Sequence, residues 1–340
     1  MTRWSALLLG LPLLSPAWAA EAPTGLQADV TFSLGSELAG RSELLRRLAT
    51  PLAALRLEQL ALKSGQRAPD QPIDLASERF TLYVPETAPA KGYALLVFVS
   101  PAARSAVPRH WSPVLDRHGM IFVSAGNAGN DADVVERRAP LALLAARNVM
   151  ARYRVDPERT YVGGISGGSR VAEELALGYP DLFRGALLEA GSNPLGGEVA
   201  LPPRDLFHRF QDQSRLVYLT GGRDSFHLEE DAHSRSSMAD YCVFDIDTES
   251  APNLGHELAD AASLDSALTA LEQHQGGDVP ACRQRLEHEM TAALDQAAAL
   301  LAAGKTSDAK KLLGETDARF GGLAAPRIIE LAERALGAPG

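Results

Sequence analysis

Hydrophobic positions near the amino terminus recur with the period of a helix. Between Ser42 and Lys63, leucines are spaced three, four or seven residues apart, as on one face of an amphipathic helix. Pro51 lies inside this stretch and is a site at which the helix can bend. A proline-rich segment at 68–72 follows and is typical of a linker. The pattern predicts a helical region and linker over residues 20–77.

From residue 78 onward, short apolar runs alternate with longer helical patterns. Apolar runs of this length are typical of strands buried on both faces. The alternation predicts an α/β fold over residues 78–280, with a mostly parallel central sheet, helices on both faces and functional loops at the carboxyl ends of the strands. The predicted strands are Phe80–Val84, Tyr93–Val99, Met120–Ser124, Tyr161–Val162, Leu187–Leu188, Leu216–Leu219 and Val243–Ile246, and the predicted helices are Leu141–Tyr153 and Ser169–Leu177.

Only helical patterns remain in the C-terminal region, 281–340. An Ala/Leu-rich helix is predicted over Cys282–Ala303, followed by helices over Asp308–Ala318, with Ser307 as N-cap, and over Ala325–Leu336. This hairpin resembles a single tetratricopeptide-like unit. One such unit is too little for a solenoid, so we expect it to pack on the main domain.

Residues 1–19 have the layout of a secretory signal peptide. Arg3 forms a positive n-region, 6–14 an apolar h-region, and Ala17-Trp18-Ala19 a small-x-small cleavage site. The apolar run is about half the length that spans a bilayer, and no later stretch reaches about 18 uninterrupted apolar residues. We therefore expect an exported protein, periplasmic or secreted, without a membrane span.

The amino-acid composition limits the kinds of partner and cofactor that we expect. A content of 46% hydrophobic and 22% charged residues is that of a globular protein, and a formal net charge of −10 argues against nucleic acid as a partner. In an oxidising compartment Cys242 and Cys282 are expected to form a disulfide, with two separate buried thiols as the alternative. The chain has no CxxC and no HExxH motif, so we expect no metal and no cofactor. Oligomeric state is not predicted.

Candidate chemistry begins where a predicted strand meets a predicted helix. There the motif G-x-S-x-G appears as Gly164, Ser166 and Gly168. In a nucleophile elbow both glycines are required, because side chains at these positions would collide with the neighbouring strand or helix. Such a turn exposes Ser166 Oγ and leaves the Gly167 N–H at a helix N-terminus as an oxyanion donor. A plain glycine-rich turn is the alternative.

A serine nucleophile requires a base and an orienting acid. His256 lies in a loop after the last predicted strand, and Asp224 lies just beyond an earlier strand, which gives the chain order Ser, Asp, His. In that place Asp224 can orient the imidazole and stabilise its cation. Rival acids are Asp231, Asp245 and Asp247. The other histidines are His110 and His118 before the nucleophile, His274 and His288 in helical stretches, and His208, His227 and His233 without a distinguishing position.

Three motifs around the serine carry a resemblance: Val155–Tyr161 leading into the elbow, Tyr179–Phe183 after the following helix, and Gly221–Asp224. With them, residues 78–275 resemble secreted esterases related to polyhydroxybutyrate depolymerases and feruloyl esterases, in the α/β-hydrolase superfamily. The resemblance implies hydrolysis of a small-molecule or polymeric ester through an acyl-enzyme. A serine peptidase, or a non-catalytic exported binding protein on the same fold, is the alternative.

The chain departs from these esterases after the strand Tyr93–Val99. Where they carry a His-Gly-type segment, this chain reads Ser100–Arg104. Pro101 has no N–H, so the second oxyanion donor falls to Ala102 or Ala103. Substrate-binding candidates, which are alternatively solvated loop residues, are Asn127 and Asn130, with Arg137 and Arg138.

Overall fold

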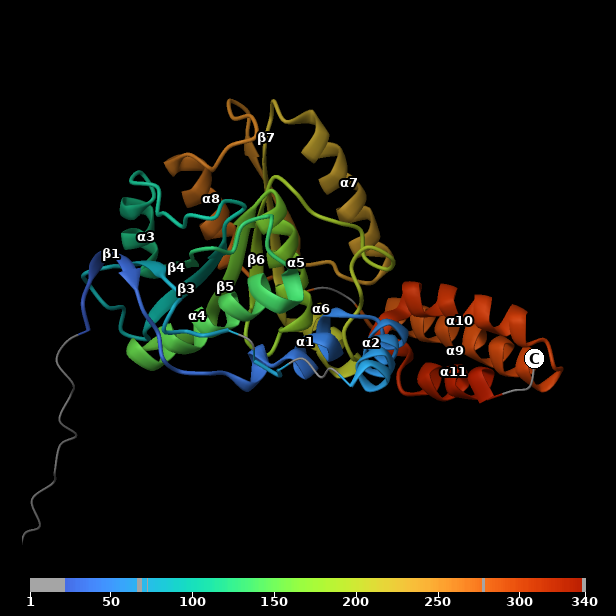
Figure 1. The fold of residues 1–340 in the computed structure, drawn as a ribbon. Coiled ribbons are helices and arrows are strands. Elements are labelled where there is room, and N and C mark those ends of the chain that lie inside the picture. Colours follow the sequence, from blue (N-terminus) through green and yellow to red (C-terminus); the bar gives the residue numbers. More distant parts are fainter. Residues whose placement is uncertain (1–21, 66–68, 72, 277–278, 338–340) are drawn as a thin grey trace, which may run out of the picture.

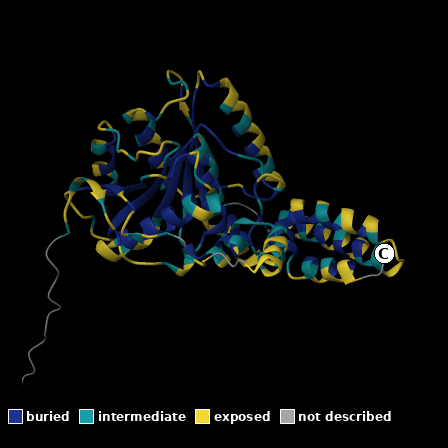
Figure 2. Cartoon of the chain, viewed as in Figure 1, coloured by how far each residue is buried: buried dark blue, intermediate teal, exposed yellow. Residues whose placement is uncertain are grey.

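The computed structural model describes residues 22–65, 69–71, 73–276 and 279–337, so the predicted signal peptide lies outside the described residues. A central sheet carries helices on both faces, and a helical lobe projects from one end (Figure 1). The strands are mostly buried, while the helices keep exposed outer faces (Figure 2). Within the described ranges, no helix is long and apolar enough to cross a membrane.

Eight strands of the described residues form the central sheet. They are β1 (Gly25–Val30), β2 (Phe80–Val84), β3 (Tyr93–Val99), β4 (Met120–Ala125), β5 (Val155–Ile165), β6 (Gly185–Glu189), β7 (Arg215–Gly221) and β8 (Ile246–Ala251). Their order is β1-β2-β4-β3-β5-β6-β7-β8; β2 is antiparallel to its neighbours β1 and β4, and the other neighbouring strands are parallel. This is the α/β-hydrolase fold, and the predicted fold class is confirmed.

Helices form a layer on each face of the sheet. The helices of the described residues are α1 (Arg41–Leu48), α2 (Pro51–Ser64), α3 (Ser112–His118), α4 (Ala139–Arg152), α5 (Gly167–Gly178), α6 (Arg204–Gln213), α7 (Ser225–Asp240), α8 (Ala261–Leu271), α9 (Pro280–Ala302), α10 (Thr306–Phe320) and α11 (Arg327–Gly337), with short turns η1 (Glu37–Ala39), η2 (Val134–Arg138) and η3 (Gly321–Ala324). One face packs against α3 and α8, and the other against α4 and α5, with α1 and α6 beside α5. The sheet is thereby buried on both sides, which leaves its carboxyl edge for the site.

The N-terminal region differs from the prediction. Instead of one bent helix, 42–63 lies mainly in two helices, α1 and α2, which separate at Thr50. Thr50 caps α2 by accepting a hydrogen bond from the Ala53 N–H (3.4 Å), and Pro51 occupies the first turn, where its missing N–H costs nothing. The region also supplies β1, an edge strand with partly exposed residues and therefore no clear apolar pattern.

Two other boundaries are corrected. The last strand, β8, begins at Ile246, where the predicted strand Val243–Ile246 ended. The prediction followed the apolar Val243, which is buried but precedes the strand, whereas β8 is an edge strand of mostly polar residues. In the C-terminal region, Ser307 lies inside α10 and Lys305 occupies the N-cap position.

The C-terminal helices pack together with α2 as a lobe (Figure 1). Asp317 of α10 accepts hydrogen bonds from the Thr50 hydroxyl and from the Leu52 N–H (3.1 Å). The predicted disulfide is confirmed: Cys242 and Cys282 are bonded, with their Cα atoms 5.7 Å apart, and join the segment before β8 to α9. The lobe is thus tied both to the N-terminal helices and to the chain entering the sheet.

Candidate active site

Ser166 lies at the sharp turn between β5 and α5. Its φ of 57° and ψ of −128° are strained for a residue with a side chain. Its N–H donates to the Glu189 carbonyl at 2.8 Å, which ties the turn to β6. A methyl group on Gly164 would lie 2.4 Å from the Gly168 carbonyl oxygen, and one on Gly168 would lie 2.0 Å from that of Val99. The steric need predicted for both glycines is therefore present.

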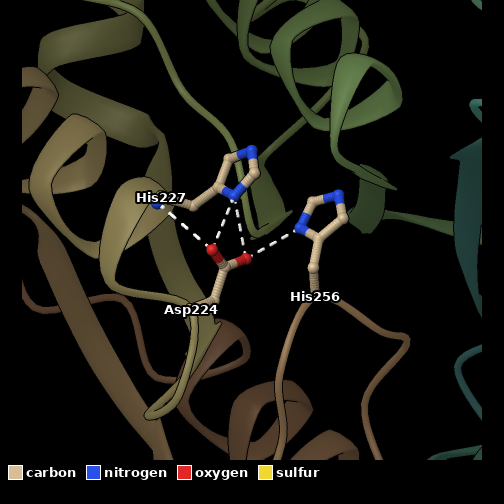
Figure 3. A group of neighbouring side chains, drawn as sticks. All are labelled: Asp224, His227 and His256. Carbon is tan, nitrogen blue, oxygen red and sulfur yellow. Dashed lines mark hydrogen bonds and ion pairs between the residues drawn. The ribbon is translucent and has the colours of Figure 1, made fainter.

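Asp224 and His256 are in contact beyond the ends of β7 and β8 (Figure 3). His256 Nδ1 is 2.7 Å from Asp224 Oδ2. Because an ionised carboxylate only accepts hydrogen bonds, a neutral His256 carries its proton on Nδ1 and leaves Nε2 free to act as a base. The structure thus brings together the predicted acid and the predicted base.

The surroundings keep the Asp224 carboxylate charged. Its side chain is only 8% exposed, whereas that of His256 is 42% exposed. Burial raises the pKa of Asp224, but the hydrogen bonds from His227 and His256 outweigh it and hold the pKa below its ordinary value. Asp224 is therefore ionised at neutral pH and can stabilise an imidazolium.

His227, for which the sequence showed no distinguishing position, is the third member of this cluster (Figure 3). Its Nδ1 lies 2.9 Å from Asp224 Oδ1 and 2.8 Å from Oδ2. Its ring is nearly parallel to that of His256, with centroids 4.2 Å apart and planes inclined by 12°. The missed signal was spacing: a histidine three residues after a strand-end aspartate is its neighbour once a helix begins there.

The three side chains also offer ligand atoms that lie within 4.8 Å of one another. However, His227 Nδ1 and His256 Nδ1 both converge on Asp224 Oδ2, at 2.8 and 2.7 Å. Asp224 Oδ2 therefore occupies the position between the two nitrogens. A metal ion would need that position to be empty, with each ligand atom about 2 Å away. We interpret the group as a hydrogen-bonded cluster.

The rival acids have other partners. Asp231 is buried on α7 and accepts hydrogen bonds from the hydroxyls of Ser192 (2.6 Å) and Thr220. Asp245 and Asp247 both bind Arg215 at the amino end of β7. Of the four aspartates considered, Asp224 is the one that contacts His256.

The predicted oxyanion donors lie near Asn130. A methyl group on Gly167 would be 2.3 Å from Asn130 Oδ1, so the Asn130 amide lies against the residue after the serine. Asn130 also donates its backbone N–H to the Pro101 carbonyl (2.9 Å). The Ala102 N–H donates to Ser100 Oγ (3.1 Å), a bond that it would have to exchange in order to bind an oxyanion.

Of the other candidates in this loop, Asn127 bonds through its backbone, whereas Arg137 and Arg138 donate from their guanidinium groups to backbone carbonyls. The Asn127 N–H donates to the Ala103 carbonyl, and the Asn127 carbonyl accepts from Arg137 Nε, both at 2.6 Å. The buried Arg138 donates to the Ala128 carbonyl (2.9 Å). The Asn127–Ala103 contact joins the loop after β4 to the loop after β3, and the Asn127 side chain is exposed.

Glu189, at the end of β6, links the two halves of the site. Its Oε2 accepts from the Ala259 N–H (3.0 Å), in the loop that carries His256, while its carbonyl holds the Ser166 N–H. Burial raises the pKa of Glu189 to about 8, so it is protonated at neutral pH. The missed signal was a charged residue directly after the apolar pair Leu187–Leu188.

Ser166, Asp224 and His256 follow β5, β7 and β8, whose carboxyl ends share one edge of the sheet. In the part of the chain that is described, the Ser166 hydroxyl makes no hydrogen bond to another side chain. Catalytic hydrogen bonds of free enzymes are often long and shorten with substrate. A hydrogen bond between Ser166 Oγ and His256 Nε2 is accordingly expected only once substrate is bound.

A surface hollow lies elsewhere among the described residues. It measures about 390 Å³ and is lined by Arg117, His118, Arg159 and Glu272, among others, at the amino ends of β4 and β5. Its charged side chains pair with one another, as in Arg159–Glu272 and His118–Glu272. The hollow is thus separate from the serine turn at the opposite end of β5.

No family model matches the chain, and no curated protein matches it. Similar solved structures include a protein of Bacteroides ovatus named as a dipeptidyl aminopeptidase IV (TM-score 0.42, 16% identity, 57% of this chain and 33% of that chain). An S-formylglutathione hydrolase from Staphylococcus aureus (0.46, 12%, 58% and 93%) and a ferulic acid esterase (0.41, 16%, 57% and 90%) are also similar. This chain spans only a third of the first protein, and at these identities the likeness concerns the fold alone.

Proposed function

We propose that this chain is a serine hydrolase that cleaves carboxylic esters with Ser166 as nucleophile, His256 as base and Asp224 as orienting acid. The supporting observation is the 2.7 Å contact between His256 Nδ1 and Asp224 Oδ2, at the sheet edge that carries the strained Ser166 turn. A carboxylate on Nδ1 leaves Nε2 ready to take a proton. Because one fold hosts many activities, the proposal rests on the site.

The bonds and protons of the reaction are exchanged between the ester, Ser166, His256 and water. Ser166 Oγ attacks the carbonyl carbon while its proton passes to His256 Nε2, and a tetrahedral oxyanion forms. The bond to the alcohol oxygen breaks, the alcohol takes that proton, and the acyl group stays on Ser166. Water then attacks the acyl-enzyme with the same proton transfers, which releases the carboxylic acid and restores the serine. The net reaction turns an ester and water into an acid and an alcohol.

Two donors are proposed to hold the oxyanion. The first is the Gly167 N–H at the start of α5. The second is the Asn130 side-chain amide, whose nitrogen and oxygen exchange places by a half-turn, with the predicted Ala102 N–H as the alternative. Asn130→Ala should lower kcat by about 100-fold. A loss of less than about threefold would leave Ala102 as the donor.

The proposal includes export to the periplasm or the medium. It is supported by the signal-peptide pattern of residues 1–19 and by the Cys242–Cys282 disulfide, a bond that persists in oxidising compartments. Sequencing of the secreted protein should find an amino terminus just after Ala19. An uncleaved amino terminus on protein retained in the cytoplasm would contradict it.

The test compares p-nitrophenyl esters of increasing acyl length with peptide p-nitroanilides, for the wild type and Ser166→Ala. Ester turnover that is lost in the variant is the expected result. Turnover of anilides alone would replace the ester with a peptide bond. A folded wild type that turns over neither would favour the non-catalytic binding protein.

A further inference from the structure

A single carboxylate that holds two imidazoles is more than a serine–histidine–aspartate site requires. Asp224 caps α7 and contacts both His256, from the loop after β8, and His227, from the first turn of α7 (Figure 3). The mechanism above uses one of these rings. The centroid of the second ring lies 4.2 Å from that of the first, and both rings bond to the same carboxylate.

We propose that His227 is a positioning residue that fixes the Asp224 carboxylate and shares its charge, and so sets both the orientation and the proton affinity of His256. The inference rests on the proposed hydrolase function. It assigns to His227 no contact with substrate.

The orientation part follows from the contacts of each ring. The side chain of His256 is 42% exposed and makes a polar contact with Asp224 Oδ2. The side chain of His227 is only 13% exposed, and its Nδ1 reaches both carboxylate oxygens while its backbone N–H donates to Oδ1 (3.4 Å). The buried His227 therefore fixes the orientation of the Asp224 carboxylate, and the exposed His256 bonds to the carboxylate in that orientation.

The charge part follows from the shared acceptor. Two N–H donors divide the negative charge of Asp224, so the imidazolium of His256 is stabilised less than it would be by an undivided carboxylate. Removal of the His227 donor should then raise the proton affinity of His256. Because the base must be deprotonated to accept the serine proton, the acid limb of the activity profile should move to higher pH.

The other charges around His227 do not cancel this effect. On α7, Glu230 Oε2 lies 3.8 Å from His227 Nε2, and Asp231 is buried one residue further along. From α5, Arg170 forms an ion pair with Glu230. From the loop after β8, the facing group is His256. Asp224 is therefore the carboxylate with direct contacts to both rings.

Two substitutions separate the parts of the proposal. His227→Phe keeps a flat ring and removes the Nδ1 donor. His227→Asn keeps a donor near the position of Nδ1 and removes the ring and its titration. His233→Phe is the matched control, because His233 is an exposed histidine of the same helix.

The measurement is kcat and KM for a short p-nitrophenyl ester from pH 5 to 9, with thermal unfolding as a check on folding. For His227→Phe we expect kcat to fall roughly 10- to 100-fold with KM nearly unchanged, and the acid limb to rise by about 0.5 to 1 pH unit. His227→Asn should recover most of kcat, and His233→Phe should match the wild type.

Three results would overturn the inference in an active enzyme. They are wild-type kcat with an unmoved acid limb in His227→Phe, equal losses in the Phe and Asn variants without a pH shift, and activity that survives in His256→Phe but not in His227→Phe. The last result would make His227 the base. A folded wild type without ester turnover would instead refute the proposed function itself.

Discussion

Strand β7 has an aspartate–histidine contact near each of its ends, and the two contacts differ in their fixed charge. At the amino end, the Arg215 side chain is 3% exposed and donates to Asp245 and to Asp247 (2.7 Å). His274 also contacts Asp245. A guanidinium is always charged, so Arg215 balances the negative charge of Asp245 whether or not His274 holds a proton.

At the carboxyl end the partners of the aspartate are imidazoles. Asp224 contacts His227 and His256, and among the described residues no lysine or arginine bonds to its carboxylate. Its negative charge is therefore available to the imidazolium that the proposed hydrolysis forms on His256. The comparison teaches that an aspartate–histidine pair is structural beside a permanent cation and available for catalysis where the cation is transient.

Substitution of the histidine at each end should give the largest difference in kcat between the two ends. His256→Gln removes the proposed base and should lower kcat by about a million-fold, as loss of a triad histidine does elsewhere. His274→Gln, at the amino end, should change kcat by less than about twofold, because Arg215 still neutralises Asp245. Ester turnover by the two purified variants checks this, and comparable losses would remove the distinction.

Substitution of Asp224 at the carboxyl end should give the next largest effect on kcat. Asp224→Asn keeps the shape of the side chain but removes its charge and its ability to hold the Nδ1–H tautomer of His256, so kcat should fall by about 10,000-fold. Steady-state kinetics on variant protein with unchanged circular dichroism measures this. A loss of less than tenfold would show that Asp224 is not the orienting acid.

At the amino end the same change should act on stability. Asp245→Asn leaves Arg215 buried without its main counter-charge, which should lower the free energy of unfolding by about 3–5 kcal/mol. The kcat of the folded variant should stay at the wild-type value. Urea unfolding combined with the ester assay tests both parts, and a stable variant with reduced kcat would contradict them.

The effect expected at Glu189 is a pH dependence of the free energy of unfolding. Unfolded, its carboxyl loses a proton near 4.5, and folded it keeps the proton up to about 8. Between these values the folded state binds more protons, so the free energy of unfolding falls as pH rises, by up to about 1.4 kcal/mol per pH unit. Glu189→Gln should match the wild type near pH 4.5 and exceed it at pH 8.

Glu173, whose pKa burial also raises to about 8, provides the control for this experiment. It remains in the Glu189→Gln variant, so about half of the slope from the two groups should survive. Urea unfolding at pH 5 and pH 8 measures the slope. An unchanged slope would show that Glu189 is already ionised in the folded protein.

The site was predictable where a local rule applies. The glycines around Ser166 are demanded by the turn itself, and strand ends pointed to Asp224 and to the loop of His256. His227 was missed because its contact exists only once α7 begins at Ser225, a boundary that the apolar pattern does not mark. The first residue of a helix with few apolar positions on one face cannot be recognised from the apolar pattern of the sequence.

The fold was predictable for the same reason, and it was misread at its edges. Central strands such as β3 are apolar along their length and stand out. The edge strands β1 and β8 are partly exposed and mostly polar, so β1 was missed and β8 was placed a few residues early. Edge strands take their position from the neighbouring strand, which is a non-local contact.

The most direct test of the central claim is labelling with a fluorophosphonate, followed by mass spectrometry of the peptide that carries Ser166. The proposed enzyme should be labelled at Ser166 Oγ, should lose ester turnover in step with labelling, and should show neither labelling nor turnover as Ser166→Ala. A folded, unlabelled wild-type protein, or a label on another residue with turnover intact in Ser166→Ala, would contradict the account.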